Sequence, residues 1–359
     1  MDGEVRGVLA VKLAIIVCAN GLGHLKRSMR IVSRLCHRIS DLRVALFCEP
    51  WQIEVLESWR LHWQASHVTP VPVSLPVRWD PDREYYGEWL LDWHAVMSNW
   101  NLSDFDYVLS DNLVEPLVYT DRVTLSGSFL WHDVLALAFP QSGDVEKYRS
   151  WCEEVLLSVR PKMVVNRYFA MPATGEQTDV REVGLIHFRP DLDAKRSNPL
   201  PGRVLIALGH ARLADDAVDE LFAVIPGLQT AGMQVLALPP WFELLSQRCR
   251  GLERYDWSGD NLGTVDLAII RGGLGTISDC IAARIPMLYL DDPSPEIKFN
   301  QARLCQMGIG LPLEKVLDDG SPLLTDAAVY AHMRARMDGF ALAGEIEASE
   351  VLAKLWGWT

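Results

Sequence analysis

The chain has 359 residues, of which 49% are hydrophobic and 23% charged, a composition typical of a water-soluble globular protein with room for two domains. Its formal net charge of −13 argues against nucleic acid as the main partner, because such a surface needs a surplus of Lys and Arg. The seven cysteines form no CxxC pair and no metal-ligand spacing, which predicts reduced thiols and no metal site.

Short apolar runs alternate with amphipathic stretches along the first half of the chain. The runs 13–19, 43–49, 105–111 and 122–130 are rich in Ile, Val and Leu, and we expect them to form buried strands. Helical spacing of apolar residues follows the first two of these runs. Continuous apolar strands that alternate with helices predict a parallel sheet covered on both faces.

The apolar start of the chain differs from a signal peptide. Its leader MDGEV is acidic, Lys12 interrupts the apolar run, and a glycine-rich segment follows where a cleavage site would stand. No stretch approaches the roughly 20 apolar residues that a membrane-spanning helix needs. No basic and hydrophobic patch favours a peripheral membrane contact. We therefore expect a cytoplasmic protein that does not span the membrane.

The alternation of strands and helices breaks once. Residues 189–203 are polar, carry three prolines and show no periodicity, which predicts an interdomain linker. Strand-like runs resume at 204–210, 265–273 and 286–292. In each half of the chain a strand runs into a glycine-rich turn and then into a helix.

These patterns predict an α/β protein with two doubly wound domains. We expect an amino-terminal, acceptor-binding domain at 1–195 and a carboxyl-terminal, donor-binding domain at 196–340. The final segment, 341–359, has the composition of a helix that packs back on the first domain. Doubly wound sheets bind ligands at the carboxyl ends of their strands, so we expect a ligand cleft between the domains.

The glycine-rich turn RGGLGTISD has features of an anion site. Gly272, Gly273 and Gly275 follow a buried strand and permit positive φ and close approach of the backbone. Thr276 stands at an expected N-cap, with Asp279 three residues later to complete a capping box. The N–H groups at such a helix start are suited to bind a diphosphate. A well-capped turn without a ligand explains the same residues.

The stretch DLAIIRGGLGTISDCIAARIPMLYLDD, continued by EIKFNQARLCQMGIG, resembles the carboxyl-terminal signature of GT-B glycosyltransferases. The resemblance spans 265–311 and is closest to the family 28 type, which includes the N-acetylglucosaminyltransferase that makes lipid II. It implies a GT-B fold, in which two Rossmann-like domains face each other across a cleft. It also implies a nucleoside diphosphate sugar as donor substrate, with a UDP sugar favoured, and no cofactor.

The resemblance also implies particular donor-binding residues. The loop 272–276 would hold the diphosphate, and Asp279 stands where the family has a ribose-binding glutamate. Ile297 replaces the family's glutamine beside Glu296, so recognition of the donor sugar is not carried over. The candidate donor-binding residues are Gly21, Gly23, Gly209, His210, Arg271, Gly272, Gly273, Leu274, Gly275, Thr276, Asp279, Glu296, Asn300 and Gln301.

The run VLIALGH resembles the first strand of the family's carboxyl-terminal domain. This likeness implies that Gly209 and His210 face the donor phosphates. A strand that ends in an ordinary turn explains His210 equally well.

The segment GLGHLKRSMRI resembles the amino-terminal loop of the same superfamily, G-x-G-H-x-x-R/P followed by a helix. An attacking acceptor hydroxyl must lose a proton, and an imidazole, with an unperturbed pKa of about 6.5, is suited to take it. His24 is therefore the candidate general base, and a hydrogen-bonded structural histidine is the alternative. Lys26 and Arg27 are suited to bind phosphate or an anionic acceptor, although a solvated helix face explains them as well.

Two further features concern the acceptor side. Asp111 ends a strand-like run, where it would orient the base or the nucleophile, or simply cap the next segment. Eight of the tryptophans fall between residues 51 and 131, and the segment 74–94 lacks periodicity. Aromatic faces stack on sugar rings, so we expect an acceptor pocket here with a loop that covers it.

Three functions follow from these residues. The first is an inverting, metal-independent glycosyltransferase of the hexosyltransferase type, with a carbohydrate, lipid-linked or small-molecule acceptor. The second is a nucleotide-sugar hydrolase, because GLGHLKR and FNQARL also resemble the UDP-sugar hydrolase of pseudaminic acid synthesis. The third is a non-catalytic protein that binds sugar nucleotides. The tryptophan-rich insertion favours an acceptor larger than water, and hence the first function.

Overall fold

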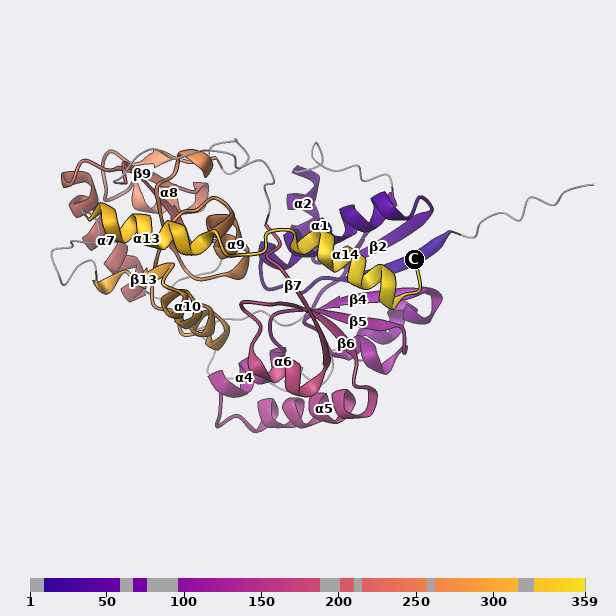
Figure 1. Ribbon diagram of the computed structural model, residues 1–359. Helices are drawn as coiled ribbons and strands as arrows, with labels where there is room; N and C mark the ends of the chain where they lie inside the picture. The colour runs from indigo at the N-terminus through magenta and orange to yellow at the C-terminus, as the bar shows by residue number, and fades with distance from the viewer. Residues whose placement is uncertain are drawn as a thin grey trace, which may run out of the picture. The chain divides into compact units, whose positions relative to one another are not determined.

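The computed structural model describes residues 10–58, 67–75, 96–187, 201–209, 215–256, 262–315 and 326–358. The chain divides into two compact units, drawn in Figure 1. The first unit is Met1–Trp79, Arg83–Val183 and Ala343–Thr359, and the second is Asp80–Asp82 and Gly184–Leu342. The sequence placed these boundaries at residues 195 and 340. The expected linker lies mostly outside the described residues.

The first unit is built on a sheet of parallel strands in the order β3-β2-β1-β4-β5-β6-β7. This order places the ends of β1 and β4, which are far apart in the sequence, next to each other. The strands are β1 Val11–Ile16, β2 Leu42–Cys48, β3 Val68–Pro72, β4 Tyr107–Asp111, β5 Val123–Gly127, β6 Lys162–Asn166 and β7 Asp179–Val183.

Helices cover both faces of this sheet. Figure 1 shows α1 (Leu22–Arg38) and α14 (Gly344–Leu355) side by side on one face, and α4 (Trp131–Ala138), α5 (Gly143–Val159) and α6 (Pro172–Gln177) on the other. Two short helical segments complete the described unit near the site, α2 at Pro50–Ser58 and η6 at Glu115–Val118. Two single turns, η4 at Ser98–Trp100 and η5 at Leu102–Asp104, precede β4.

Ion pairs and an aromatic cluster join the end of the chain to the first unit. Arg34 of α1 bonds Glu345 of α14 at 3.1 Å. The Tyr107 hydroxyl donates to the carbonyl of Trp356 at 2.7 Å, and the two rings stack with centroids 4.9 Å apart. The final helix therefore belongs to the first unit, although the whole second unit precedes it in the sequence.

The second unit repeats the doubly wound plan, with parallel strands in the order β10-β9-β8-β11-β12-β13. Its strands are β8 Arg203–Ala207, β9 Gln234–Ala237, β10 Glu253–Arg254, β11 Leu267–Ile270, β12 Met287–Tyr289 and β13 Gly310–Pro312. Its helical segments are α7 Asp215–Thr230, α8 Pro239–Leu245, η7 Leu262–Thr264, α9 Leu274–Ala282, α10 Pro295–Met307 and α13 Ala327–Met337.

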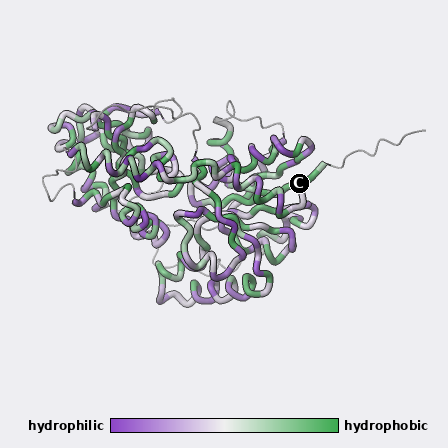
Figure 2. Tube along the Cα trace, viewed as in Figure 1, coloured by the Kyte–Doolittle hydropathy of each residue, from purple (hydrophilic) through white to green (hydrophobic). Residues whose placement is uncertain are grey.

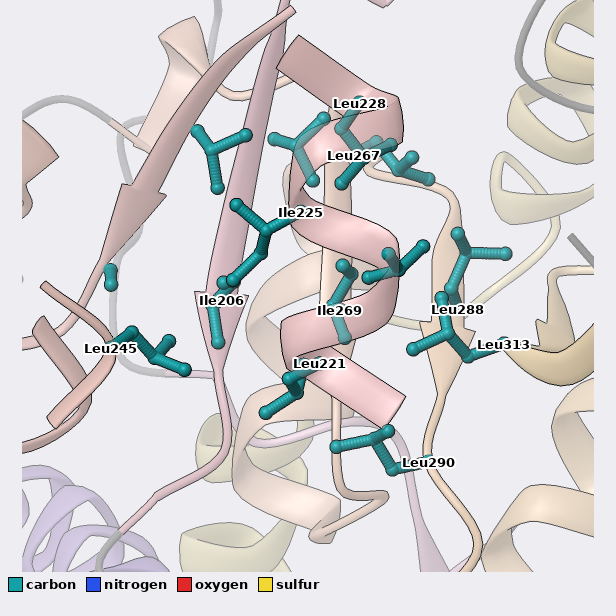
Figure 3. Packing of buried hydrophobic residues seen from close by; sticks show 14 of the residues in the cluster. Ile206, Leu221, Ile225, Leu228, Leu245, Leu267, Ile269, Leu288, Leu290 and Leu313 are labelled. Atoms are coloured by element: carbon teal, nitrogen blue, oxygen red, sulfur yellow. The ribbon is translucent and has the colours of Figure 1, made fainter. Parts of the chain in front are cut away.

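Aliphatic side chains fill the space between α7 and the sheet of the second unit. Figure 3 shows Leu221 and Ile225 of α7 directed at Ile206 of β8 and Ile269 of β11, and all four are fully buried. Each such side chain contributes about 1.5–3 kcal/mol relative to an exposed position. Figure 2 shows the corresponding pattern, with hydrophobic strands and helices on which hydrophobic and hydrophilic residues alternate.

Helix α1 begins earlier than its apolar periodicity predicts. The apolar residues with helical spacing after the first strand-like run lie at 30–39 (RIVSRLCHRI) and predict a helix from about residue 30. In the structure α1 starts at Leu22 and follows Gly21, whose φ of 119° is accessible to glycine. Leu25, Met29 and Val32 extend the buried stripe through the polar segment. The glycine-histidine segment is therefore the first turn of a helix and not a loop that precedes one.

No helix in the described part of the chain is both long and apolar enough to cross a membrane.

Candidate functional site

The carboxylate of Asp111 joins β4 to α1 at the carboxyl end of the first sheet. Its Oδ1 accepts from His24 Nδ1 at 2.7 Å and from Arg27 Nη2 at 2.6 Å, and its Oδ2 accepts from the Ser28 hydroxyl at 3.1 Å. The three donors lie at positions i, i+3 and i+4 of α1, which share one helix face. The fold thus brings together His24 and Asp111, the two residues that the sequence proposed for catalysis.

The charges around Asp111 determine its ionisation state. Burial raises the pKa of this carboxyl, which is only 1% exposed, but the Arg27 guanidinium and then His24 outweigh burial, so the net pKa is lowered. An ionised carboxylate only accepts hydrogen bonds, so in the neutral form of the His24 ring the proton is on Nδ1. Nε2 then carries the lone pair, and no described residue forms a hydrogen bond with it.

Arg27 does not lie on a solvated helix face, and its Nη2 is used by Asp111 rather than held open for an anion. The side chain is 16% exposed, and its Nε is buried without a hydrogen-bond partner. The sequence missed this role for Arg27 and the bond from Ser28. Both would follow from helical spacing if the helix were known to begin at Leu22.

Gln52 of α2 holds the segment between β1 and α1. Its side-chain N–H groups donate to the carbonyls of Cys18 at 3.0 Å and Gly21 at 3.3 Å, and its Oε1 accepts from the backbone N–H of Glu49 at 3.1 Å. The residue is fully buried. Gln52 therefore fixes the residues that immediately precede the histidine, a positioning role that sequence patterns did not reveal.

Aromatic residues pack beside the histidine. Phe129 approaches the His24 ring edge-to-face at 6.1 Å and contacts Trp131 in the same manner at 4.9 Å. The Trp131 indole N–H donates to Cys18 Sγ at 3.1 Å, and burial, followed by the charge of Asp111, raises the pKa of this thiol to about 12. The His24 ring therefore has an aromatic neighbour beside its charged partners, and Cys18 is neutral.

The glycine-rich loop of the second unit forms one tight turn followed directly by a helix. Gly272 has a φ of 120°, and a Cβ at this position would lie 3.1 Å from Gln301 Cγ and from Ile297 Cγ2. Gly273, with φ −66°, is the N-cap of α9 and Gly275 lies inside the helix, so only Gly272 requires a positive φ.

The predicted capping box in the same loop is wrong. Helix α9 begins at Leu274, so Thr276 is its third residue, and no side chain caps the helix. The cause is the extended backbone of Gly273, which starts the helix earlier than the Thr-x-x-Asp pattern indicated. The N–H groups of 274–276 consequently have no partner within α9. Asp279 lies further along α9 and is 4% exposed.

Arg271, directly after β11, is fixed by an aspartate that follows β12. Its guanidinium makes a two-pronged contact with Asp292, through Nε and, at 3.2 Å, through Nη2. Asp292 in turn accepts from the backbone N–H of Ser294 at 2.9 Å. The pair anchors a candidate phosphate-binding arginine, and the sequence did not single out Asp292.

Two residues carried over as donor-binding use their amide groups to support the loop. Gln301 Nε2 donates to the carbonyls of Arg271 at 2.7 Å and Leu290 at 2.6 Å, and Asn300 Nδ2 donates to the carbonyl of Gly272 at 3.1 Å. Asn300 Oδ1 is buried without a partner, and Asn300 Nδ2 also lies 3.5 Å from Glu296 Oε1. These side-chain amides hold the backbone of the loop through its carbonyl groups, and the Asn300 Oδ1 acceptor has no hydrogen-bond partner.

Several predicted features lie outside the described residues. His210 is one of them, although Gly209 is described, with a φ of 75° and a carbonyl that accepts from Trp241 Nε1 at 2.9 Å. Of the eight clustered tryptophans, those at 51, 100 and 131 are described, and the expected acceptor loop falls almost wholly in an undescribed segment. Among the described residues no group of three or more His, Cys, Asp and Glu side chains could hold a metal ion.

Comparisons with known proteins add information on the fold. No family model matches the chain, and no curated protein sequence matches it. The crystal structure of the glycotransferase of kitacinnamycin is similar, with a TM-score of 0.64 and 15% identity over 96% of this chain and 98% of that chain.

Two structures with nucleotides bound are also similar. One is Medicago truncatula UGT71G1 complexed with UDP-glucose, with a TM-score of 0.60 and 14% identity over 97% of this chain and 98% of that chain. The other is UDP-glucose: anthocyanidin 3-O-glucosyltransferase in complex with UDP, with a TM-score of 0.65 and 12% identity over 98% and 99% of the two chains. At such identities the likeness concerns architecture. The chain has the GT-B fold, with two doubly wound Rossmann-like units.

Proposed function

We propose that this protein is a glycosyltransferase that moves a sugar from a nucleoside diphosphate sugar to an acceptor hydroxyl. The observation that carries the proposal is the bond of 2.7 Å between His24 Nδ1 and Asp111 Oδ1 at the carboxyl end of the first sheet. This bond leaves Nε2 as a proton acceptor. The GT-B fold supports the same class of reaction, because the similar structures are glycosyltransferases.

In the proposed reaction the first unit supplies the base. The acceptor oxygen attacks the anomeric carbon while His24 Nε2 takes the hydroxyl proton, and the bond from that carbon to the diphosphate oxygen breaks. Asp111 stabilises the imidazolium that forms. A single displacement of this kind inverts the configuration at the anomeric carbon.

The second unit supplies the proposed donor site. The N–H groups of 274–276 are suited to the diphosphate because α9 leaves them unpaired and its dipole is positive there. Arg271 adds a fixed positive charge beside them. We propose that these groups stabilise the leaving diphosphate in place of a metal ion. Asp279 would contact the ribose.

The comparisons and the sequence together support one class of donor and a broad class of acceptors. Two similar structures hold UDP or UDP-glucose, and one of them is named for a small aromatic acceptor, an anthocyanidin. We propose a UDP hexose as donor and a small-molecule, carbohydrate or lipid-linked acceptor. The family 28 likeness of residues 265–311 supports the same donor class.

The test begins with binding and ends with turnover. A thermal-shift panel of UDP-, GDP-, CDP- and dTDP-sugars identifies the donor, and acceptors are then screened for transfer with EDTA present. His24→Gln should lower kcat about 100-fold or more, with little change in the KM for the donor. His37→Gln is the matched control, because His37 is an exposed histidine of the same helix that bonds only the Ser33 carbonyl. Stabilisation by none of these nucleotide sugars would refute the proposal.

Hydrolysis is the second candidate, favoured by the likeness of GLGHLKR and FNQARL to a UDP-sugar hydrolase. The same chemistry would serve, with water in place of the acceptor hydroxyl. Release of free sugar at a rate that no acceptor changes would favour the hydrolase. A donor that binds without any turnover would indicate a non-catalytic sugar-nucleotide-binding protein.

A further inference from the structure

Asp111 has a charged partner, Arg27, that it does not need in order to orient the His24 ring. Arg27 Nη2 donates to Oδ1, the same oxygen that receives His24 Nδ1–H, and lies 3.3 Å from Nδ1 itself. Because Nδ1 carries a proton, this last contact joins two donors that share one acceptor. If Asp111 only oriented the His24 ring, the hydrogen bonds from His24 and Ser28 would be sufficient to hold its carboxylate in place.

The charges in this cluster sum differently with and without Arg27. Asp111 and a neutral His24 alone carry one negative charge, which favours protonation of the ring. With Arg27 the cluster is neutral when His24 is neutral, and protonation would give it a net positive charge in a buried site. Arg27 therefore opposes the effect that Asp111 has on the protonation of the imidazole.

The neighbouring groups reinforce this balance or leave it unchanged. His24 is the third residue of α1, so the positive end of the helix dipole also disfavours an imidazolium. Cys18, at the end of β1, is a neutral thiol. Phe129 and Trp131 contribute apolar rings. Arg27 has the largest charge effect on Asp111 and lowers the pKa of this carboxyl, ahead of the protonated form of His24.

We propose that Arg27 is a positioning residue for the base: it neutralises Asp111, so that the carboxylate orients the His24 ring without making the ring hold a proton. The inference rests on the proposed function in taking His24 as the base. As a consequence, the His24 ring is unprotonated at a lower pH than it would be in a His–Asp pair without the arginine. The activity should therefore extend further into the acidic range.

The test measures the protonation of His24 directly and needs no substrate. The whole chain is labelled with ¹³C at the histidine Cε1 positions, and the signal of His24 among the nine histidines is assigned by its loss in His24→Gln. In Arg27→Gln the titration midpoint of His24 should rise by about one pH unit or more, a tenfold gain in proton affinity. Arg27→Lys, which keeps the charge, should restore most of the difference.

A control and a second background complete the experiment. Arg38→Gln removes a cation of the same helix that pairs with Glu350. Arg38 lies about 21 Å along the helix from His24, so the titration midpoint of His24 should not change. If Arg27→Gln does not fold, the same substitution is made in Asp111→Asn, where no buried carboxylate loses its partner. There too it should raise the midpoint by about one unit.

The outcomes separate this inference from the proposed function. A His24 midpoint that stays within about 0.3 units in both backgrounds would overturn the role of Arg27, whatever reaction the protein performs. Once a donor and an acceptor are known, the acid limb of kcat/KM in Arg27→Gln should move upward with the midpoint. A midpoint that moves while the acid limb does not would refute His24 as the base and leave the charge balance intact.

Discussion

Glu115 is predicted to make the first unit more stable at acidic than at alkaline pH. It begins η6, four residues after Asp111, and is completely buried. The Tyr148 hydroxyl donates to its Oε1 at 2.6 Å, while Oε2 has no partner. Burial raises the pKa of this carboxyl to about 7, despite the opposing hydrogen bond from Tyr148.

The difference in pKa fixes both the sign and the size of the effect. The unfolded chain releases this proton at about 4.5 and the folded protein at about 7, so the folded state holds the extra proton between these values. Stability is therefore fully present below pH 4.5 and is lost as the pH rises through 7. At about 1.4 kcal/mol per pKa unit, the loss amounts to about 3 kcal/mol.

The substitution Glu115→Gln should remove this dependence, since a glutamine still accepts from Tyr148 and never ionises. Urea unfolding of wild type and variant at pH 5 and pH 8 measures the gap between them. From pH 5 to pH 8 the free energy of unfolding of the wild type should fall by about 2.5 kcal/mol relative to that of the variant, because a small part of the loss is already complete at pH 5. Glu154→Gln, an exposed position on α5, is the control and should show no such movement. A change in the Glu115→Gln gap below about 1 kcal/mol would refute the reasoning.

Two predictions concern the proposed donor loop, residues 272–276. Gly272→Ala should destabilise the second unit by about 1–2 kcal/mol and weaken binding of UDP, because the residue has a φ of 120° and an added Cβ would contact Gln301. Gly273→Ala is the control and should be tolerated. Thermal unfolding measures the stability and isothermal titration the binding. Asp292→Asn should raise the KM for the donor, because Arg271 loses its two-pronged partner; an unchanged KM in steady-state kinetics would mean that Arg271 does not contact the donor.

The architecture was predictable because its signal is local and redundant. Most central strands of the two sheets are short, mainly apolar runs, and 13–19 and 267–270 are clear examples. The division into two doubly wound halves follows from the repetition of such runs. Pairing of β1 with β4 is a further consequence of that topology, and it is what brings Asp111 to His24.

The details of the site were less predictable because its residues depart from the patterns that reveal structure. Polar His24 and Arg27 interrupt the apolar stripe of α1, so periodicity placed the start of the helix too late. Thr276 fits a capping box, but the extended Gly273 starts the helix first. Gln52 and Asp292 act on backbone or side chains that are distant in the sequence, and no local pattern records such partners.

The two arginine–aspartate pairs are difficult to explain by stability alone. Asp111 is the last residue of β4 and Asp292 follows β12, and both are nearly fully buried. The desolvation of a buried ion pair often cancels its Coulomb attraction, and well-packed apolar residues would serve a fold at least as well. The pairs instead fix a cation in each unit, next to His24 in the first and next to the start of α9 in the second. Under the proposed function, the cation of the first unit offsets the charge of Asp111 beside the base, and the cation of the second unit lies near the departing diphosphate, which gives the costly pairs a function.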